Sequence, residues 1–307
     1  MTWLISCRMS EGTKKMTFSI IVVCLNAGDK LRETIGSIQS QTEQDYEIII
    51  KDGGSEDSTT QAYLKEYEKF CEENHSQDDM ARGFVRLYRS SDKGIYDAMN
   101  QAVQYVRGDY VLFLNCGDTF HDNEVLSRVK RYISQTGRQS GQRLEQSAEA
   151  LVSRCIFYGN IHERRTNTSV QSNPVIDDFA CYRNIPCHQA CFYDAGLLRE
   201  KSFDISYAVR ADYEHFLWCY YKGHAKTVYM PLVVAFYEGG GFSETRENER
   251  RSRQEHREIV EKYMPAAKVR KYRLIMAVTL APFRTWIARN PVTAGIYQTF
   301  KRKLYKR

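Results

Sequence analysis

Carboxylate and carboxamide side chains follow three apolar segments of this chain. Asn26 comes directly after FSIIVVCL, Asp52 after YEIIIK, and Asn115 with Asp118 at the end of YVLFL. Carboxylate oxygens bind divalent cations and accept N–H and O–H donors, so these residues could contact a charged ligand. Asn, Asp and Gly also form tight turns, and turn formation would be the better explanation for one such cluster alone. Three clusters at one sheet edge favour a binding site.

A second group of polar residues lies in the C-terminal half. His188 and Gln189 are adjacent, and Asp212 and Glu214 lie near the start of a predicted helix over Ala208–Tyr221. Two helical residues at this spacing point in different directions, so we expect only one of the two acids to face a ligand. The alternative explanation for both is an acidic helix start, which the helix dipole favours.

The elements that must position these residues alternate between strands and helices. Apolar, β-branched runs predict strands, and helical spacing or capping residues predict the helices between them. Such alternation indicates βαβ units and a mostly parallel sheet, whose ligands bind beyond the carboxyl ends of the strands. The predicted strands are Phe18–Leu25, Tyr46–Ile50, Phe84–Tyr88, Tyr110–Leu114, Ile156–Ile161 and Val228–Tyr237, and the clearest N-terminal helix is Ile95–Val106.

Composition excludes several classes of protein. With 42% hydrophobic and 12% aromatic residues in 307, the chain is neither disordered nor fibrous. Its longest apolar stretch, Leu274–Phe283, is too short to span a bilayer. Nine cysteines without paired spacing indicate a reducing compartment. The N-terminus shows no signal-peptide pattern, and Met16 is a second candidate start.

Six motifs follow one another along the chain: Asp52-Gly53-Gly54-Ser55, Asp92–Asn100, Leu114–Asp118, Cys187-His188-Gln189, Ala211–Glu214 and Gly239–Ser243. The ordered set is more specific than any one of them. In this order, the set resembles the family 2 glycosyltransferases of the GT-A fold, above all bacterial enzymes of capsule, O-antigen and exopolysaccharide assembly. The resemblance covers roughly Phe18 to Ser243 and implies a GT-A, Rossmann-like α/β fold.

The resemblance implies roles for the strand-end residues. Asp118 is expected to hold Mg²⁺ or Mn²⁺ with the donor diphosphate, although Asn115 and Gly117 stand where the family commonly has further aspartates. Asp52 is expected to contact the nucleotide base, and an acceptor-only carboxylate matches the N3–H of uracil. This favours a UDP-sugar as donor.

The resemblance also assigns nucleotide-sugar contacts to Asn26, Lys93, Gly94, Asp97 and Asn115. A lysine near the diphosphate is electrostatically favourable, although Lys93 could equally be an exposed loop cation. Asp97 could face the donor, or it could anchor the preceding loop to the helix backbone.

Inverting sugar transfer needs a base for the proton of the acceptor hydroxyl. Asp212 aligns with the family position that supplies this base, and Glu214 is the second candidate. His188 and Gln189 resemble a pair that faces the acceptor or donor sugar in the same family.

The charge of the chain is unevenly distributed. The net charge is +6, but residues 262–307 contain 12 Lys or Arg and no acid, which leaves 32 basic and 38 acidic groups in residues 1–261. Basic residues mixed with apolar ones predict an amphipathic segment that lies on an anionic membrane surface, with packing against the catalytic domain as the alternative. An acidic body disfavours nucleic acid as a partner. We therefore expect a cytoplasmic protein, peripheral on the inner face of the cytoplasmic membrane.

The domain prediction is an N-terminal extension at 1–16, a GT-A domain at 17–245, and a charged, then basic helical segment at 246–307. The functional prediction is an inverting hexosyl- or N-acetylhexosaminyltransferase that moves a sugar from a nucleotide donor to a saccharide acceptor, polyprenyl-diphosphate-linked, in cell-surface polysaccharide biosynthesis. The alternative is a non-catalytic GT-A scaffold of an assembly complex, which Asn115 and Gly117 in place of acids would support.

Overall fold

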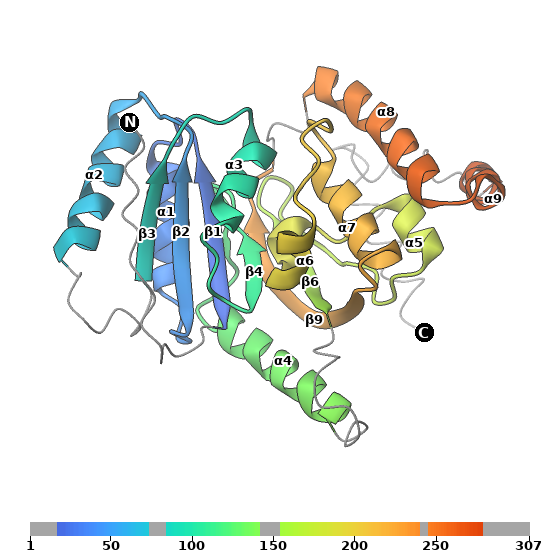
Figure 1. Ribbon diagram of the computed structural model, residues 1–307, viewed down its shortest axis with the longest axis horizontal. Helices are drawn as coiled ribbons and strands as arrows, with labels where there is room; N and C mark the ends of the chain where they lie inside the picture. The colour runs from blue at the N-terminus through green and yellow to red at the C-terminus, as the bar shows by residue number, and fades with distance from the viewer. Residues whose placement is uncertain (1–16, 74–83, 142–153, 240–244, 279–307) are drawn as a thin grey trace.

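The computed structural model describes residues 17–73, 84–141, 154–239 and 245–278 (Figure 1). The predictions for residues 1–16, for 240–243 and for the basic residues beyond 278 lie outside this part. The elements are β1 (Phe18–Cys24), α1 (Asp29–Gln39), β2 (Tyr46–Asp52), α2 (Ser58–Glu73), β3 (Phe84–Arg89), α3 (Ile95–Val103), β4 (Tyr110–Phe113), β5 (Thr119–Phe120), α4 (Val125–Gly141), β6 (Cys155–Glu163), β7 (Thr168–Val170), α5 (Asp178–Arg183), the 3-10 helix η1 (His188–Ala190), β8 (Cys191–Asp194), α6 (Ala195–Glu200), α7 (Ala211–Tyr221), β9 (Lys226–Tyr237), α8 (Arg246–Tyr263) and α9 (Ala266–Val278).

One sheet runs through the molecule in the order β3-β2-β1-β4-β8-β6-β9-β5, with β7 beside β6. The pairs β3–β2, β2–β1 and β1–β4 are parallel, as predicted for the N-terminal half. Beyond β4 the sheet is mixed, because β8 runs antiparallel to both β4 and β6, whereas β6 and β9 are parallel.

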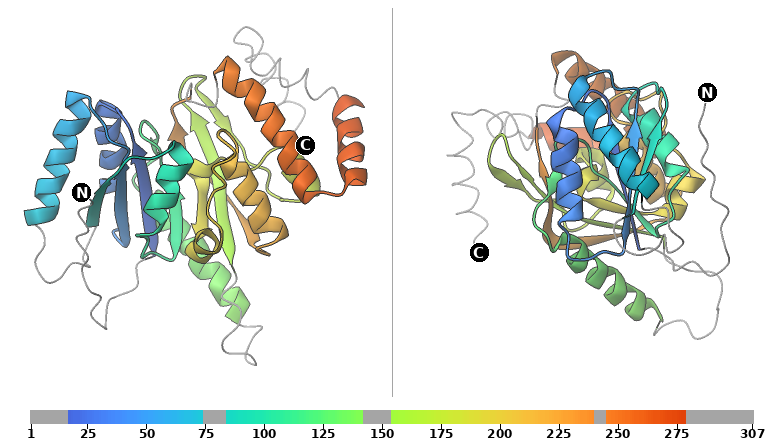
Figure 2. Two further views of the ribbon diagram at one scale, coloured as in Figure 1. Left: turned by 45° about the horizontal axis from the view of Figure 1, so that its top comes forward. Right: turned by 90° about the vertical axis from the view of Figure 1, so that its left-hand side faces the viewer.

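The apolar strands are covered on both faces (Figure 2). Every residue of β1 is buried, and alternate side chains enter different cores. Ile20 and Val22 join the core beneath α1, α2 and α4, whereas Ile21 and Val23 join the core formed with α3, α6, α7 and α8. This double coverage explains why the sequence of β1 is continuously apolar rather than alternating.

Helix α8 packs against the α/β body of the molecule. Ile259 and Val260 of α8 and Val269 of α9 belong to the same hydrophobic cluster as α7. The densely charged sequence of α8 therefore forms a helix with one buried face. The predicted domain boundary between residues 245 and 246 stays a prediction. None of the helices in the described ranges combines the length and hydropathy that crossing a bilayer requires.

Two glycines provide a matched test of close backbone packing around β1 and α1. A Cβ on Gly108 would lie 2.6 Å from the Ser19 backbone nitrogen, whereas a Cβ on Gly36 in α1 would meet no atom within 4 Å. We expect Gly108→Ala to lower the free energy of unfolding by about 1–3 kcal/mol through overpacking. Gly36→Ala should raise it by up to about 1 kcal/mol, since alanine is the better helix former. Urea unfolding measures both, and equal effects would contradict the close approach at Gly108.

Candidate active site

The predicted strand ends converge at one edge of the sheet. Cys24 at the end of β1 is in register with Asp52 at the end of β2, and β4 pairs with β1 on the other side. Asn26 serves the turn here, because its side-chain oxygen accepts the backbone N–H of Glu56 at 2.8 Å. Its own backbone N–H donates to Ser55 Oγ at 2.8 Å. The structure thus places Asn26 as an anchor between the β1 and β2 loops.

Asp52 is buried and holds its own turn. Its Oδ1 accepts the Ser55 hydroxyl at 2.6 Å and the Ser55 backbone N–H at 3.1 Å. Arg89 Nε lies 3.4 Å from Oδ2. Asp52 therefore stabilises its own turn. It also lies at the end of a strand, where the sequence predicts a binding site.

Lys51 is a buried cation that we did not predict. The strand was expected to end at Ile50, but β2 continues to Asp52. The Lys51 ammonium donates to the carbonyls of Asp52 at 3.0 Å and Ser90 at 2.7 Å, and pairs with Asp92 at 3.2 Å. These bonds satisfy a charge that burial would otherwise make costly. A lysine directly before the strand-end acid was the signal in the sequence.

The loop that carries Lys93 and Gly94 is held from both sides. Asp92 Oδ1 accepts the Gly94 backbone N–H at 3.1 Å, and Asp97 Oδ2 accepts that of Lys93 at 2.9 Å. Gly94 has φ 121°, a conformation that glycine adopts without strain. Asp97 thus makes the loop-anchoring contact, one of its two predicted alternatives, and the Lys93 side chain is exposed.

A hydrogen-bonded chain joins Asn115, His188 and Asp212. Asn115 Nδ2 lies 3.1 Å from His188 Nε2, and His188 Nδ1 lies 3.3 Å from Asp212 Oδ2. The Tyr96 hydroxyl donates to Asp212 Oδ1 at 3.0 Å. Tyr96 was not predicted, because an aromatic residue at a helix start is usually read as core. The structure therefore brings Tyr96 and His188 into contact with the Asp212 carboxylate, and Asn115 into contact with His188.

The Asp212 carboxyl is shifted toward its charged form. Burial alone would raise its pKa, but the hydrogen bonds from His188 and Tyr96 outweigh burial and lower it. The side chain is 22% exposed, so it is not closed off from solvent. Asp212 is thus a carboxylate at neutral pH, the form that can accept a proton.

Asp118 lies beside this chain of residues. Its Oδ2 accepts from the Gln189 amide at 2.8 Å and its Oδ1 from the Glu238 backbone N–H at 2.9 Å. Burial raises the pKa of Asp118, although these two donors act in the opposite direction. The pair His188-Gln189 therefore contacts both predicted acids, Asp212 and Asp118.

The side chains near Asp118 fit only a cation that takes most of its ligands from phosphate and water. Among the described residues, no three His, Cys, Asp or Glu side chains lie close enough together to hold a metal ion. A Cβ on Gly117 would collide with the carboxylate of Glu238, and Gly117 has φ 96°. An acid could therefore not replace this glycine without rearrangement. Asp118 would supply one oxygen, leaving other positions to phosphate and water, as Mg²⁺ tolerates.

The structure corrects the place of Glu214. This second candidate base is fully buried, and its carboxylate pairs with Lys201 at 2.6 Å and Lys262 at 2.7 Å and accepts from Tyr263 at 2.5 Å. Burial would raise its pKa, but these three partners lower it. Because Glu214 faces α8 and not His188, it has the contacts of an internal ion pair that joins α7 to the end of α8.

Comparisons with known proteins identify the family of this chain. The family described as Glycosyl transferase family 2 matches residues 19–168. A PGL/p-HBAD biosynthesis glycosyltransferase of Mycobacterium tuberculosis is 33% identical over 230 residues, which cover 74% of this chain and 79% of that protein. An uncharacterized glycosyltransferase of the same species is 27% identical over 67% of this chain and 69% of its own length.

Solved structures share the fold. S. aureus TarS 1-349 in complex with UDP superposes with TM-score 0.58 at 15% identity, over 84% of this chain and 69% of that chain. The mannosyltransferase PcManGT from Pyrobaculum calidifontis, in complex with GDP-Man and Mn²⁺, gives TM-score 0.57 at 15% identity, over 96% and 82%. The chain spans 37% of the longer S. aureus TarS structure.

These matches confirm the predicted GT-A fold, and the chain belongs to glycosyl transferase family 2. It is a glycosyltransferase, and the expected resemblance to bacterial enzymes is consistent with its relatives.

The internal ion pair at Glu214 gives a prediction that separates it from Asp212. Glu214→Gln should lower the free energy of unfolding at pH 7 by about 1–3 kcal/mol, because two lysines lose their buried counter-charge. The pKa of Glu214 is lowered in the folded state, so its contribution is complete above the ordinary value of 4.5 and is lost as the pH falls below it. Urea unfolding between pH 7 and pH 3 should therefore show the difference from wild type shrinking in acid. A pH-independent difference would contradict the ion pair.

Proposed function

We propose that this chain is an inverting glycosyltransferase that moves a hexosyl or N-acetylhexosaminyl group from a UDP-sugar to a saccharide acceptor. The observation that carries the proposal is the Asp212 carboxylate, held in its charged form by His188 and Tyr96 beside Asp118. A fixed, ionised acid that is not closed off from solvent is what a general base requires.

The reaction follows from these positions. Asp212 takes the proton of the acceptor hydroxyl while that oxygen attacks the anomeric carbon from the face opposite the diphosphate. The bond from the anomeric carbon to the diphosphate oxygen breaks, and UDP leaves with the bonding electrons. One inversion at the anomeric carbon results. His188 and Tyr96 keep the carboxylate oriented during the transfer.

Asp118 is proposed as the protein ligand of a divalent cation, with Gln189 holding its carboxylate in place. Such a cation, Mg²⁺ or Mn²⁺, would neutralise charge on the departing diphosphate. The neighbour PcManGT was solved with GDP-Man and Mn²⁺, which supports divalent metal use in this fold. Lys93 is proposed as a further cation near the diphosphate.

The uridine preference rests on Asp52. Its carboxylate is acceptor-only and so can accept the N3–H of uracil. A uracil ring that reached Asp52 would replace the Arg89 guanidinium beside Oδ2. Crystal structures of S. aureus TarS contain UDP and UDP-GlcNAc, which supports a uridine donor for this chain.

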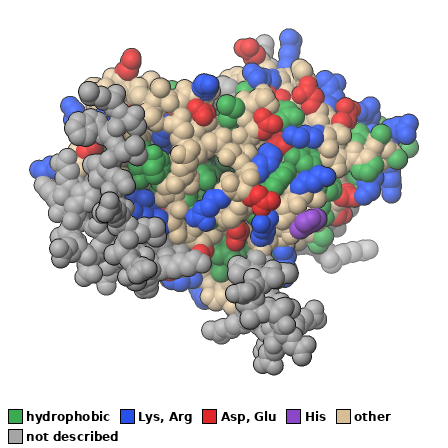
Figure 3. All heavy atoms as spheres, viewed as in Figure 1, with side chains coloured by type: hydrophobic (Ala, Val, Ile, Leu, Met, Phe, Trp, Pro, Cys, Tyr) green, Lys and Arg blue, Asp and Glu red, His purple; other side chains and the backbone are tan. Residues whose placement is uncertain are grey.

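The acceptor is proposed to be a polyprenyl-diphosphate-linked saccharide at the inner face of the cytoplasmic membrane. Helix α9 carries exposed Arg270, Lys271 and Arg273, and basic side chains gather at this end of the molecule (Figure 3). Leu274 and Val278 are 65% and 72% exposed beside them. Cations next to exposed apolar side chains suit contact with an anionic bilayer, where each cation contributes about 1 kcal/mol.

A non-catalytic scaffold is the second candidate, since no group of three or more His, Cys, Asp or Glu side chains in the described ranges could hold a metal ion. Turnover decides between the two. We expect Asp212→Asn to lower the rate of UDP release by about 10³-fold or more, as loss of a general base does. The donor is first chosen by thermal shift with a panel of nucleotide sugars, with and without Mg²⁺. Asp118→Asn should weaken the Mg²⁺ dependence and turnover together.

Glu33→Gln is the matched control, because Glu33 is an exposed acid on α1. This variant should retain wild-type turnover. Wild-type protein that releases no UDP from any donor in the presence of a crude lipid acceptor would favour the scaffold.

The membrane proposal is tested by substitutions that spare the core. Arg270→Gln with Lys271→Gln should weaken sedimentation with anionic vesicles about 30-fold, the equivalent of about 2 kcal/mol. The matched control is Lys65→Gln with Arg131→Gln, which removes the same charge from exposed positions of α2 and α4. Equal binding by both double variants would contradict a membrane role for α9.

A further inference from the structure

Three consecutive backbone N–H groups directly before α7 point at one side chain of α8. Glu255 Oε1 accepts from Ala208 at 3.0 Å, and Oε2 accepts from Val209 at 3.0 Å and from Arg210 at 2.9 Å. Glu255 is 4% exposed. The sequence predicted a helix from Ala208, but α7 begins at Ala211, after this clamped segment.

The clamped segment leads directly to Asp212. The Tyr96 hydroxyl lies 2.9 Å from the Val209 carbonyl oxygen and 3.0 Å from Asp212 Oδ1, so its single proton is shared between these two acceptors. The Tyr213 backbone N–H donates to the same Oδ1 at 2.8 Å. A shift of residues 208–210 would therefore move both the backbone and the tyrosine that orient the carboxylate.

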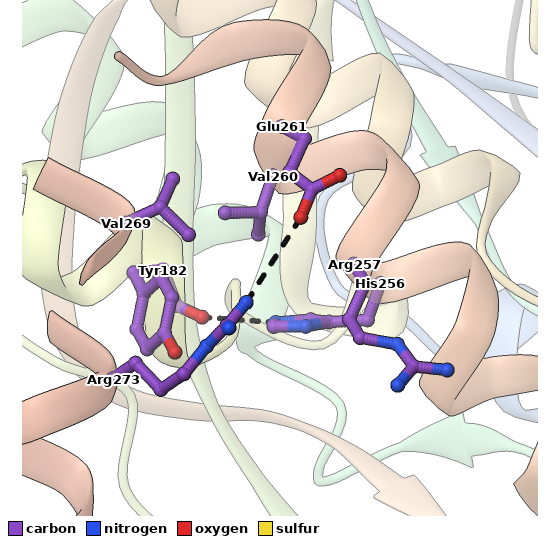
Figure 4. Close-up of a pocket in the computed structure, with 7 residues that line it drawn as sticks. All are labelled: Tyr182, His256, Arg257, Val260, Glu261, Val269 and Arg273. Atoms are coloured by element: carbon purple, nitrogen blue, oxygen red, sulfur yellow. Dashed lines mark hydrogen bonds and ion pairs between the residues drawn. The ribbon is translucent and has the colours of Figure 1, made fainter. Parts of the chain in front are cut away.

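Other contacts hold α8 in place without Glu255. Its neighbour His256 donates to the Tyr182 carbonyl at 2.9 Å and lies 3.3 Å from the Tyr213 hydroxyl. Burial lowers the pKa of His256 to about 4, so the ring is neutral at pH 7. His256 and Val260 also border a cavity of about 400 Å³ between α5, α8 and α9, across which Glu261 pairs with Arg273 at 3.9 Å (Figure 4).

We propose that Glu255 is a positioning residue for the Asp212 carboxylate, so that α8 belongs to the catalytic machinery. The inference rests on the proposed function, because it acts through the proposed base. A carboxylate that accepts three converging N–H groups fixes them more firmly than water would, since charged acceptors form the stronger hydrogen bonds. A displacement of about 1 Å at a reacting group costs about 10²-fold in rate.

The first experiment measures amide hydrogen exchange in full-length protein and needs no substrate. Glu255→Ala should speed exchange at the amides of residues 208–210 and at Tyr213, whose N–H reports the place of Asp212. The matched control is Glu258→Ala, an exposed glutamate on α8 whose partner is Gln254. Unchanged exchange in Glu255→Ala overturns the proposal.

The second experiment measures release of UDP from UDP-N-acetylglucosamine, or from the donor that stabilises the protein most. Glu255→Ala should lower kcat about 10²-fold with the KM for donor changed by less than about 2-fold, since only the orientation of the base is lost. Glu255→Gln keeps one acceptor oxygen and should recover part of the rate. In an Asp212→Asn background Glu255→Ala should cost nothing further, because both changes act on one group.

A rate loss of the same size in the Asp212→Asn background, or a wild-type rate in Glu255→Ala, overturns the positioning role. Wild-type protein without turnover would instead overturn the proposed function. In that case the hydrogen-exchange measurement alone would test whether Glu255 holds residues 208–210 in place.

Discussion

Each buried acid at this sheet edge must be met by hydrogen-bond donors, and that requirement arranges the site. A carboxylate removed from water is costly unless donors replace the water. Asp52 takes them from Ser55, Asp118 from Gln189 and the Glu238 backbone, and Asp212 from His188 and Tyr96. Ser55 lies in the same turn as Asp52, but the donors to Asp118 and Asp212 come from segments that are distant in sequence, so satisfying these two acids also fixes those segments relative to one another.

The parallel half of the fold could be predicted because its signals are local. The run Phe18–Cys24 is apolar except at Ser19, and burial on both faces is what such a run requires. The antiparallel entry of β8 between β4 and β6 could not be predicted, because nothing in four residues specifies the partner of a strand. Pairing over long sequence separation depends on the whole core.

Some site residues could likewise be predicted from local sequence signals, and others could not. Asp52, Asp118 and Asp212 follow clear strand ends or a helix start, so their positions were predictable. Tyr96 and Lys51 were missed, because their contacts, to Asp212 and to the Ser90 carbonyl and Asp92, depend on how helices and loops are placed. Glu214 was assigned the wrong surroundings for the same reason. Its spacing from Asp212 was visible, but its partners Lys201 and Lys262 lie on other elements.

The two departures from an acidic run at Asn115 and Gly117 follow from their neighbours. Asn115 Nδ2 lies 3.1 Å from His188 Nε2, and the other ring nitrogen, Nδ1, lies 3.3 Å from Asp212 Oδ2. At Gly117 the side chain of Glu238 already fills the space. The asparagine and the glycine are thus explained by their surroundings, since the first contacts His188 beside Asp212 and the second has a φ of 96° that residues with a side chain rarely adopt.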